Sequence, residues 1–450
     1  MKKIVLFIVC IVVIGVLAMP FVVKKQVLKQ IDSEKQVLLK SGVELTVTKD
    51  EGYFSSFREF ELKIINGEKF RDFVIKRFAE KNPNYKGLVE LIQKQSNKDI
   101  RPALDGTTFS GNIKNSNLYL NAPLITVSLT KFSDEIMSGI NGNKDISKLF
   151  KSILDEKLFT FFITLDSNQK ISKIVMQDID KDIKNNGETV NVKLKNHKLN
   201  IDIKESLKGV YTLEEESLTA NKFLLNTKGI EYKFDYLTQF DNKGSFHLDS
   251  FKFKEQNNVI KIGNIDVSNS IKTSNDTLSA DVKYAIKNIF MKNNNQFELA
   301  NVTIKVNIFE VNKNGVVKGT EAYNELIFEP KQDSIEKLTS ALEKVLNKGF
   351  KADIVASLSG MKFQNMIFDN SDFTLNLQVD KNSYKIDSDA MINALLINGK
   401  FTFDEKNIQD IIKLDRSLKR FIELGKKNGS KIVFDYEFKQ GILLINGKKI

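Results

Sequence analysis

The sequence predicts an α+β protein: mainly an antiparallel β meander of curved sheets with a few packed helices, preceded by one N-terminal transmembrane helix. Three observations support this. Residues 4–23 carry no charge, residues 158–330 consist mostly of runs in which apolar and polar residues alternate, and helical spacing of apolar residues occurs only in short segments. The chain has 450 residues, which is too many for one compact core, so we expect at least two folded units.

The apolar segment Ile4–Val23 is long enough to cross a membrane. As an α-helix with a rise of about 1.5 Å per residue, it matches the roughly 30 Å hydrocarbon layer of a bilayer. A cleaved signal peptide, cut after Val16-Leu17-Ala18, is the alternative, but the apolar region of a signal peptide usually has only about 7–15 residues. We therefore expect residues 1–25 to be a retained membrane anchor.

Lysines flank this segment on both sides, so the charge rule for orientation is nearly balanced. Lys2 and Lys3 precede it, and Lys24, Lys25 and Lys29 follow it. A short N-terminal tail before a first apolar segment favours a cytoplasmic N-terminus. We expect the body of the protein on the far side of the membrane.

Between the anchor and residue 158 the sequence alternates between helical and strand periods. Gly42 ends an expected helix over 24–41, and Asp50-Glu51-Gly52 joins the two strands of an expected hairpin over 43–64. The other expected elements are helices near 70–78, 88–94 and 133–156, and strands within 107–130.

A long antiparallel meander is expected next. Along one segment, Ile230, Tyr232, Phe234 and Tyr236 alternate with charged residues, and the turn 241–244 leads into a second alternating run. Such a pattern is typical of a sheet with one apolar and one solvated face. Further strands are expected at 259–267, 277–290, 296–311 and 322–329.

Pro330 marks the expected boundary between a β-rich region over 26–330 and a C-terminal α+β region over 331–450. Asp333 and Glu336 have the spacing of a capping box, and Gly349 ends the helix that follows. The other expected elements are strands at 351–358, 361–368, 372–380 and 383–399, a helix over 408–425, and a hairpin of 431–438 with 442–445. The recurring order of helix, Gly and hairpin is either a weak duplication or a chance recurrence of a common unit.

Composition excludes several classes of protein. The net charge of +11 comes from lysines mixed with acids along the chain, without the basic cluster of a nucleic-acid interface, so we expect no nucleic acid as partner. Cys10 is the single cysteine, so an intramolecular disulfide cannot form. The residues before Cys10 also lack the small side chains of a lipoprotein signal.

The two histidines give no sign of a catalytic or metal centre. His197 lies in an expected hairpin turn, and His247 points outward between Phe246 and Leu248 of an expected strand. Surface histidines of this kind are common, and a triad or metal site would need partners that the sequence does not place beside them.

Two other motifs have simpler interpretations. Asp178, Asp180 and Asp182 have the spacing that opens a calcium loop, but the glycine and the final acid of that loop are missing, so alternating acids on the wet face of a strand are expected. Ser334 and Lys337 match a Ser-x-x-Lys pattern that a helix start explains equally well. We therefore expect no catalytic, cofactor-binding or metal-binding residues, no cofactor, and no enzymatic activity.

Two segments carry a resemblance to a known family. SGVELTVTKDEGYFSSFREFELKI (residues 41–64) and the ending NGSKIVFDYEFKQGILLINGK (residues 428–448) resemble the YdgA-like family of bacterial inner-membrane proteins. In the first segment the similarity rests on Gly52, Tyr53, Phe54, Ser55 and Ser56. The resemblance implies a single-pass inner-membrane protein with a periplasmic body. It adds no catalytic residues, because no activity is assigned to the family.

The expected function is therefore binding in the cell envelope. A curved amphipathic sheet can present an apolar groove to acyl chains, although the same face can instead be filled as core. The alternative is a scaffolding protein that self-associates as a homo-oligomer or docks an envelope protein through sheet edges. An extracytoplasmic hydrolase, with carboxylates from distant strands, is the third hypothesis.

Overall fold

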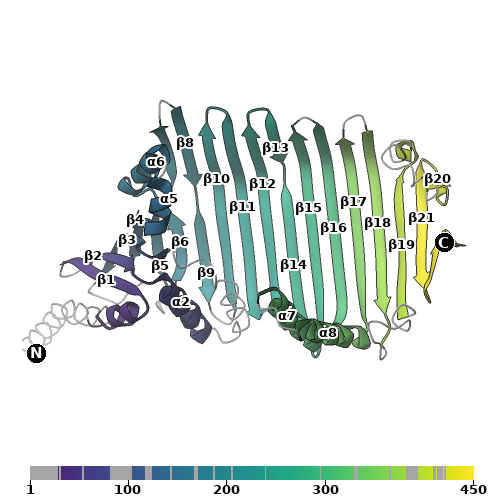
Figure 1. Ribbon diagram of the computed structural model, residues 1–450, viewed down its shortest axis with the longest axis horizontal. Helices are drawn as coiled ribbons and strands as arrows, with labels where there is room; N and C mark the ends of the chain where they lie inside the picture. Colours follow the sequence, from purple (N-terminus) through teal and green to yellow (C-terminus); the bar gives the residue numbers. More distant parts are fainter. Residues whose placement is uncertain are drawn as a thin grey trace, which may run out of the picture. The chain divides into compact units, whose positions relative to one another are not determined.

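The fold is known from a computed structural model, shown in Figure 1. The chain divides into two compact units, Met1–Glu214 and Glu215–Ile450, and strand β10 (Leu207–Ala220) runs through the boundary. The boundary expected at Pro330 falls within the range of the second unit. The structure describes residues 29, 32–52, 55–81, 104–116, 124–141, 144–166, 171–185, 188–203, 206–238, 240–293, 295–328, 333–363, 366–381, 394–408, 412, 419 and 422–450.

The first unit is an antiparallel sheet with short helices. Its strands pair in the order β1-β2-β3-β4-β5-β6-β9-β10, and β8 pairs with both β7 and β10. The elements are β1 (Val43–Glu51), β2 (Ser55–Ile64), α2 (Gly67–Lys81), β3 (Thr108–Ser116), β4 (Leu124–Lys131), α5 (Asp134–Asn141), α6 (Lys144–Asp155), β5 (Thr160–Leu165), β6 (Ile171–Met176), β7 (Ile179–Asn185), β8 (Glu188–Lys195) and β9 (Lys198–Ile203).

Most expectations for the first unit are confirmed. Residues 32–40 are helical, β1 and β2 form the expected hairpin, and α2 covers the helix expected near 70–78. The helix expected over 133–156 is instead two helices, α5 and α6, because the stretch between them is rich in Gly and Asn, which are poor helix formers. The helix expected over 88–94 lies outside the described residues.

The second unit is a meander of long antiparallel strands, as the alternating pattern predicts. Each strand pairs with its neighbours in sequence, except that β12 and β15 each pair with both β13 and β14, and β19 pairs with β21. The strands are β11 (Phe223–Thr238), β12 (Asp241–Glu255), β13 (Asn258–Ile262), β14 (Ile265–Ser274), β15 (Thr277–Lys292), β16 (Gln296–Asn312), β17 (Phe350–Phe363), β18 (Met366–Val379), β19 (Leu395–Asp404), β20 (Lys426–Asn428), β21 (Lys431–Lys439), β22 (Ile442–Ile445) and β23 (Lys448–Lys449).

Two antiparallel helices, α7 (Lys313–Phe328) and α8 (Ser334–Lys348), lie together between β16 and β17 in the sequence and near the ends of the strands (Figure 1). The strand expected over 322–329 is therefore wrong, because this segment is the end of α7. Tight helix packing explains the difference: a Cβ added at Gly315 would lie 2.7 Å from Val345 Cγ2, so the small residue lets α8 approach closely. Strands β16 and β17 still pair directly with each other across this interruption.

The expected helix after Asp333 is confirmed as α8, but the capping box is not. Asp333 has helical backbone angles and its side chain makes no capping hydrogen bond; it forms an ion pair with Lys337 at 3.0 Å instead. Gly349 follows α8 at φ +75°, a conformation that favours glycine, so the predicted helix end is confirmed.

The strand boundaries expected over 351–380 are wrong in detail. A single strand, β17, runs through Gly360, which was expected to separate two strands. Gly360 has φ +63°, and a Cβ there would lie 2.7 Å from Ala300 Cβ on the neighbouring strand, so glycine serves close strand contact rather than a turn. The last expected hairpin is confirmed as β21 with β22.

Among the described residues no helix combines the length and the apolarity needed to cross a membrane. The expected anchor, Ile4–Val23, lies outside these residues, so the prediction of a transmembrane segment stays a prediction.

Candidate functional site

The register of the second unit brings apolar side chains into line across the sheet. Directly paired residues form an uninterrupted apolar row over nine strands, flanked by parallel rows that are also mostly apolar. We call the surface that carries this row the apolar face. The row consists of Tyr232, Phe246, Val267, Tyr284, Ile304, Ala356, Phe373, Phe401 and Phe434.

The opposite face of the same strands is mostly polar. Because successive residues of a strand point to opposite faces, the residues next to this row form a second row on the far side. That row consists of Glu231, His247, Asp266, Ala285, Thr303, Ser357, Asp372, Thr402 and Val433. These nine strands are therefore amphipathic over most of their width, with Ala285 and Val433 as apolar exceptions in the second row, as the alternating sequence predicts.

The apolar face is filled at one end and open in the middle. At β19–β21, Phe403 and Phe434 stack with their ring centroids 5.8 Å apart, and Phe434 is 1% exposed because Ile408, Ile422 and Leu424 help to cover this cluster. In the middle of the row Tyr284 is 44% exposed and Ile304 is 37% exposed. No described residue therefore covers these two side chains as a core would.

Aromatic rings line the face on β11. Tyr232 and Phe234 have centroids 5.6 Å apart, Phe234 and Tyr236 have centroids 5.8 Å apart, and the two tyrosine hydroxyls are hydrogen-bonded at 3.0 Å. This pairing satisfies the polar ends of the tyrosines within the face itself. The result is a continuous strip of ring surface suited to apolar contact.

The helices α7 and α8 adjoin this face. Leu346 of α8 packs against Val379, which follows Leu377 at an interval of two and so shares its side of β18. Leu377 lies on the same side of β18 as Phe373 of the apolar row, in the second row from it. Leu342, one helical turn before Leu346, is 46% exposed, so α8 continues the apolar surface beyond the strands.

The positions predicted for the two histidines, a turn for His197 and the outward side of a strand for His247, are confirmed. His197 lies in the turn between β8 and β9, and its Nδ1 is 3.1 Å from the Tyr211 hydroxyl. His247 lies on the polar face, with Nδ1 2.6 Å from Asp266 and Nε2 3.0 Å from Asp249. The hydrogen bonds to Asp266 and Asp249 raise the pKa of His247.

The aspartates at the start of β7 form hydrogen bonds with nearby residues or point to solvent. Asp178 accepts a hydrogen bond from the Asn196 backbone N–H at 2.8 Å, and Asp182 accepts one from the Asn191 side chain at 2.9 Å. Asp180 points outward, as expected for the wet side of a strand. Within the described ranges, no three or more His, Cys, Asp or Glu side chains are grouped as metal ligands.

The Ser-x-x-Lys motif is a helix start. Ser334 is fully buried as the first residue of α8, whereas the Lys337 ammonium lies 2.9 Å from Glu325 and 3.0 Å from Asp333. The serine hydroxyl and the lysine ammonium are thus in different environments, and the lysine charge is balanced by acids.

Sequence reasoning missed a buried arginine in the first unit. Arg58 is 1% exposed, with its Nε 3.3 Å from Asp50 and its Nη2 donating to Ser56 at 3.1 Å. Burial lowers the pKa of Arg58, and the nearby carboxylate of Asp50 opposes this shift. Its position between Phe57 and Phe60 in an alternating strand is the only sequence signal of this role.

Comparison with models of protein families, with curated proteins and with solved structures finds no match to this chain. Membership of the YdgA-like family therefore stays a prediction from the two short segments that resemble it.

Proposed function

We propose that this chain is a membrane-anchored, non-catalytic protein of the YdgA-like type in the bacterial envelope, and that its apolar face binds the acyl chains of lipids. The observation that carries the proposal is the uninterrupted apolar row with half-open residues at its centre, Tyr284 and Ile304. The anchor and a periplasmic body are part of the same proposal.

Size favours an extended apolar ligand. Nine paired strands have eight steps of about 4.8 Å each, so the row is roughly 38 Å long. Monomeric soluble proteins rarely expose contiguous apolar patches beyond a few hundred Å² unless the patch binds something. Each methylene that leaves water on such a surface contributes about 0.8 kcal/mol, so a long acyl chain gains substantial affinity.

Location favours lipids over other apolar ligands. The expected anchor holds the body beside a bilayer, and Lys24, Lys25 and Lys29 follow that anchor in the sequence. Basic residues at a membrane surface attract anionic headgroups. The source of acyl chains is therefore within reach of the face that we propose binds them.

The test uses the full chain reconstituted in vesicles of phosphatidylethanolamine and phosphatidylglycerol that contain a photoactivatable acyl chain. Irradiation followed by mass spectrometry should place crosslinks on β11–β17. Ile304→Asp should abolish them, because it puts a charge at the centre of the face.

Val355→Asp is the matched control. Val355 is 49% exposed and pairs with Lys305 on the polar face, so this variant makes the same kind of change on the other side of the sheet. It should leave the crosslinks unchanged. Equal crosslinking of wild type and Ile304→Asp would refute lipid binding by this face. Protein–protein crosslinks through the same strands, without lipid, would favour the scaffolding alternative.

A further inference from the structure

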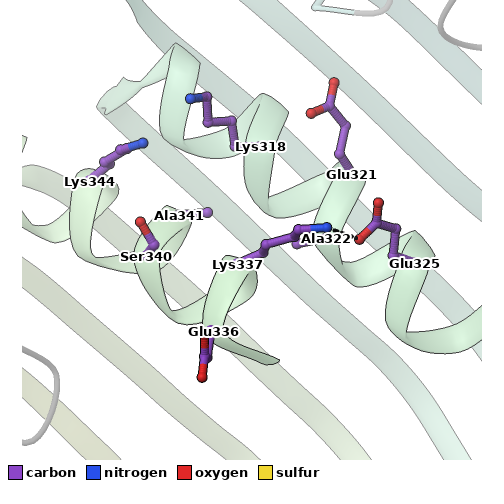
Figure 2. A pocket seen from close by; sticks show the side chains of 9 residues that line it. All are labelled: Lys318, Glu321, Ala322, Glu325, Glu336, Lys337, Ser340, Ala341 and Lys344. Atoms are coloured by element: carbon purple, nitrogen blue, oxygen red, sulfur yellow. Dashed lines mark hydrogen bonds and ion pairs between the residues drawn. The ribbon is translucent and has the colours of Figure 1, made fainter. Parts of the chain in front are cut away.

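The pair α7–α8 also forms a polar groove, separate from the apolar face. Side chains of both helices line a hollow of about 490 Å³ (Figure 2). Ala322 and Ala341, which are buried, lie at its base and hold the helices close together. The groove therefore has a floor of small, buried side chains and walls that carry charged side chains.

One end of the groove is electrostatically balanced. The Lys337 ammonium lies between Glu325 and Asp333, at 2.9 and 3.0 Å. Hydrogen bonds to these two acids raise the pKa of Lys337. The positive charge of Lys337 is therefore already balanced by these two carboxylates.

The other end concentrates positive charge. Lys318 of α7 and Lys344 of α8 project from facing sides of the groove toward each other (Figure 2). The close approach of the Lys318 side chain, whose like charge disfavours a second ammonium beside it, lowers the pKa of Lys344. In the described parts of the chain neither ammonium forms an ion pair with a carboxylate, and Figure 2 shows Glu321 and Glu336 pointing away from them.

We propose that the Lys318–Lys344 end of this groove binds a phosphate-type oxyanion, either free or as the headgroup of a phospholipid. Two ammonium groups supply up to six N–H donors and a double positive charge, which suits a tetrahedral oxyanion. The Ser340 hydroxyl lines the same groove and provides a further donor. An anion would also relieve the repulsion between the two lysines. The site is independent of acyl binding on the apolar face.

Lysine reactivity gives a direct test on the full chain in detergent. Brief acetylation with a water-soluble succinimidyl ester, read by mass spectrometry, measures the labelling rate of each lysine. Inorganic phosphate, or mixed micelles with phosphatidylglycerol, should slow labelling of Lys318 and Lys344 by about tenfold at roughly ten times the Kd. Lys305 on the polar face of the sheet is the internal reference.

The experiments with inorganic phosphate and with phosphatidylglycerol together identify the source of the anion. Protection by phosphate alone indicates a site for the free ion, whereas protection only by phosphatidylglycerol, and not by phosphatidylcholine, indicates a lipid headgroup. Lys318→Met should abolish protection of Lys344 in either case. Lys348→Met, which removes a lysine of the same helix outside the groove, should preserve it. Equal protection by sodium chloride at matched ionic strength, or no protection by either anion, would overturn the proposal.

Discussion

Gly399→Ala tests the packing that closes one end of the apolar face. Tyr436 lies directly over Gly399 and donates a hydrogen bond to the Thr374 carbonyl at 2.6 Å. A Cβ at position 399 would overlap the hydroxyl and ring of Tyr436 and the Thr374 oxygen. The tyrosine must therefore move and lose this bond.

The expected cost follows from three effects. Overpacking costs about 1–3 kcal/mol and the lost hydrogen bond about 1 kcal/mol, while replacing glycine in a strand returns roughly 0.5–1 kcal/mol. We expect Gly399→Ala to lower the free energy of unfolding by about 1–3.5 kcal/mol. The chain has no tryptophan, so urea unfolding followed by far-UV circular dichroism is the suitable assay.

Two further variants isolate the cause. In a Tyr436→Ala background the tyrosine clash is absent, so Gly399→Ala should cost at least about 1 kcal/mol less than in the wild type. Gly139→Ala, in helix α5 where no heavy atom lies within 4 Å of the added Cβ, should be neutral or stabilising. If Gly399→Ala costs the same in both backgrounds, the proposed role of Tyr436 is refuted.

Three other predictions concern burial and charge. Phe434→Ala should cost about 3–5 kcal/mol, whereas Ile304→Ala should cost roughly 1 kcal/mol in the same urea assay; equal costs would show that the face is filled. The pKa of His247 is raised in the folded protein, so the stabilisation of the fold by protonated His247 is complete below its ordinary pKa of 6.5 and is lost as the pH rises through the higher folded pKa. His247→Gln should flatten that pH dependence of the free energy of unfolding. Asp50→Asn should cost about 3 kcal/mol or more because it removes the carboxylate charge 3.3 Å from Nε of the buried Arg58, whereas Arg58→Met should cost less in thermal unfolding, because Asp50 is partly exposed and regains water.

The alternation of apolar and polar residues predicted the strands well, because each strand shows this two-residue period independently of the others. Ile230, Tyr232 and Phe234 fix which side of β11 is apolar without reference to any other strand. The alignment of Tyr232 with Phe434 across nine strands depends on register, which is set by turns and bulges between strands and cannot be read from alternation alone.

The polar groove could not be predicted from the sequence because the end of α7 was predicted to be a strand. Gly315 and Gly319 weaken the helical pattern of α7, and its last residues have the apolar composition of a strand. Lys318 and Lys344 are distant in sequence and meet only because α7 and α8 pack antiparallel. Reading the end of α7 as a strand therefore removed the element that brings the two lysines together.

The direct pairing of β16 with β17 has a consequence for how this protein can vary. Phe309 pairs with Lys351 although α7 and α8 lie between them in the sequence, so the helical pair is an insertion into a β-hairpin. A tight two-residue turn can join antiparallel strands of this kind. A shortened chain that joins β16 to β17 in this way would keep every strand pairing, and relatives that differ in this insertion would share one sheet while differing in the groove attached to it.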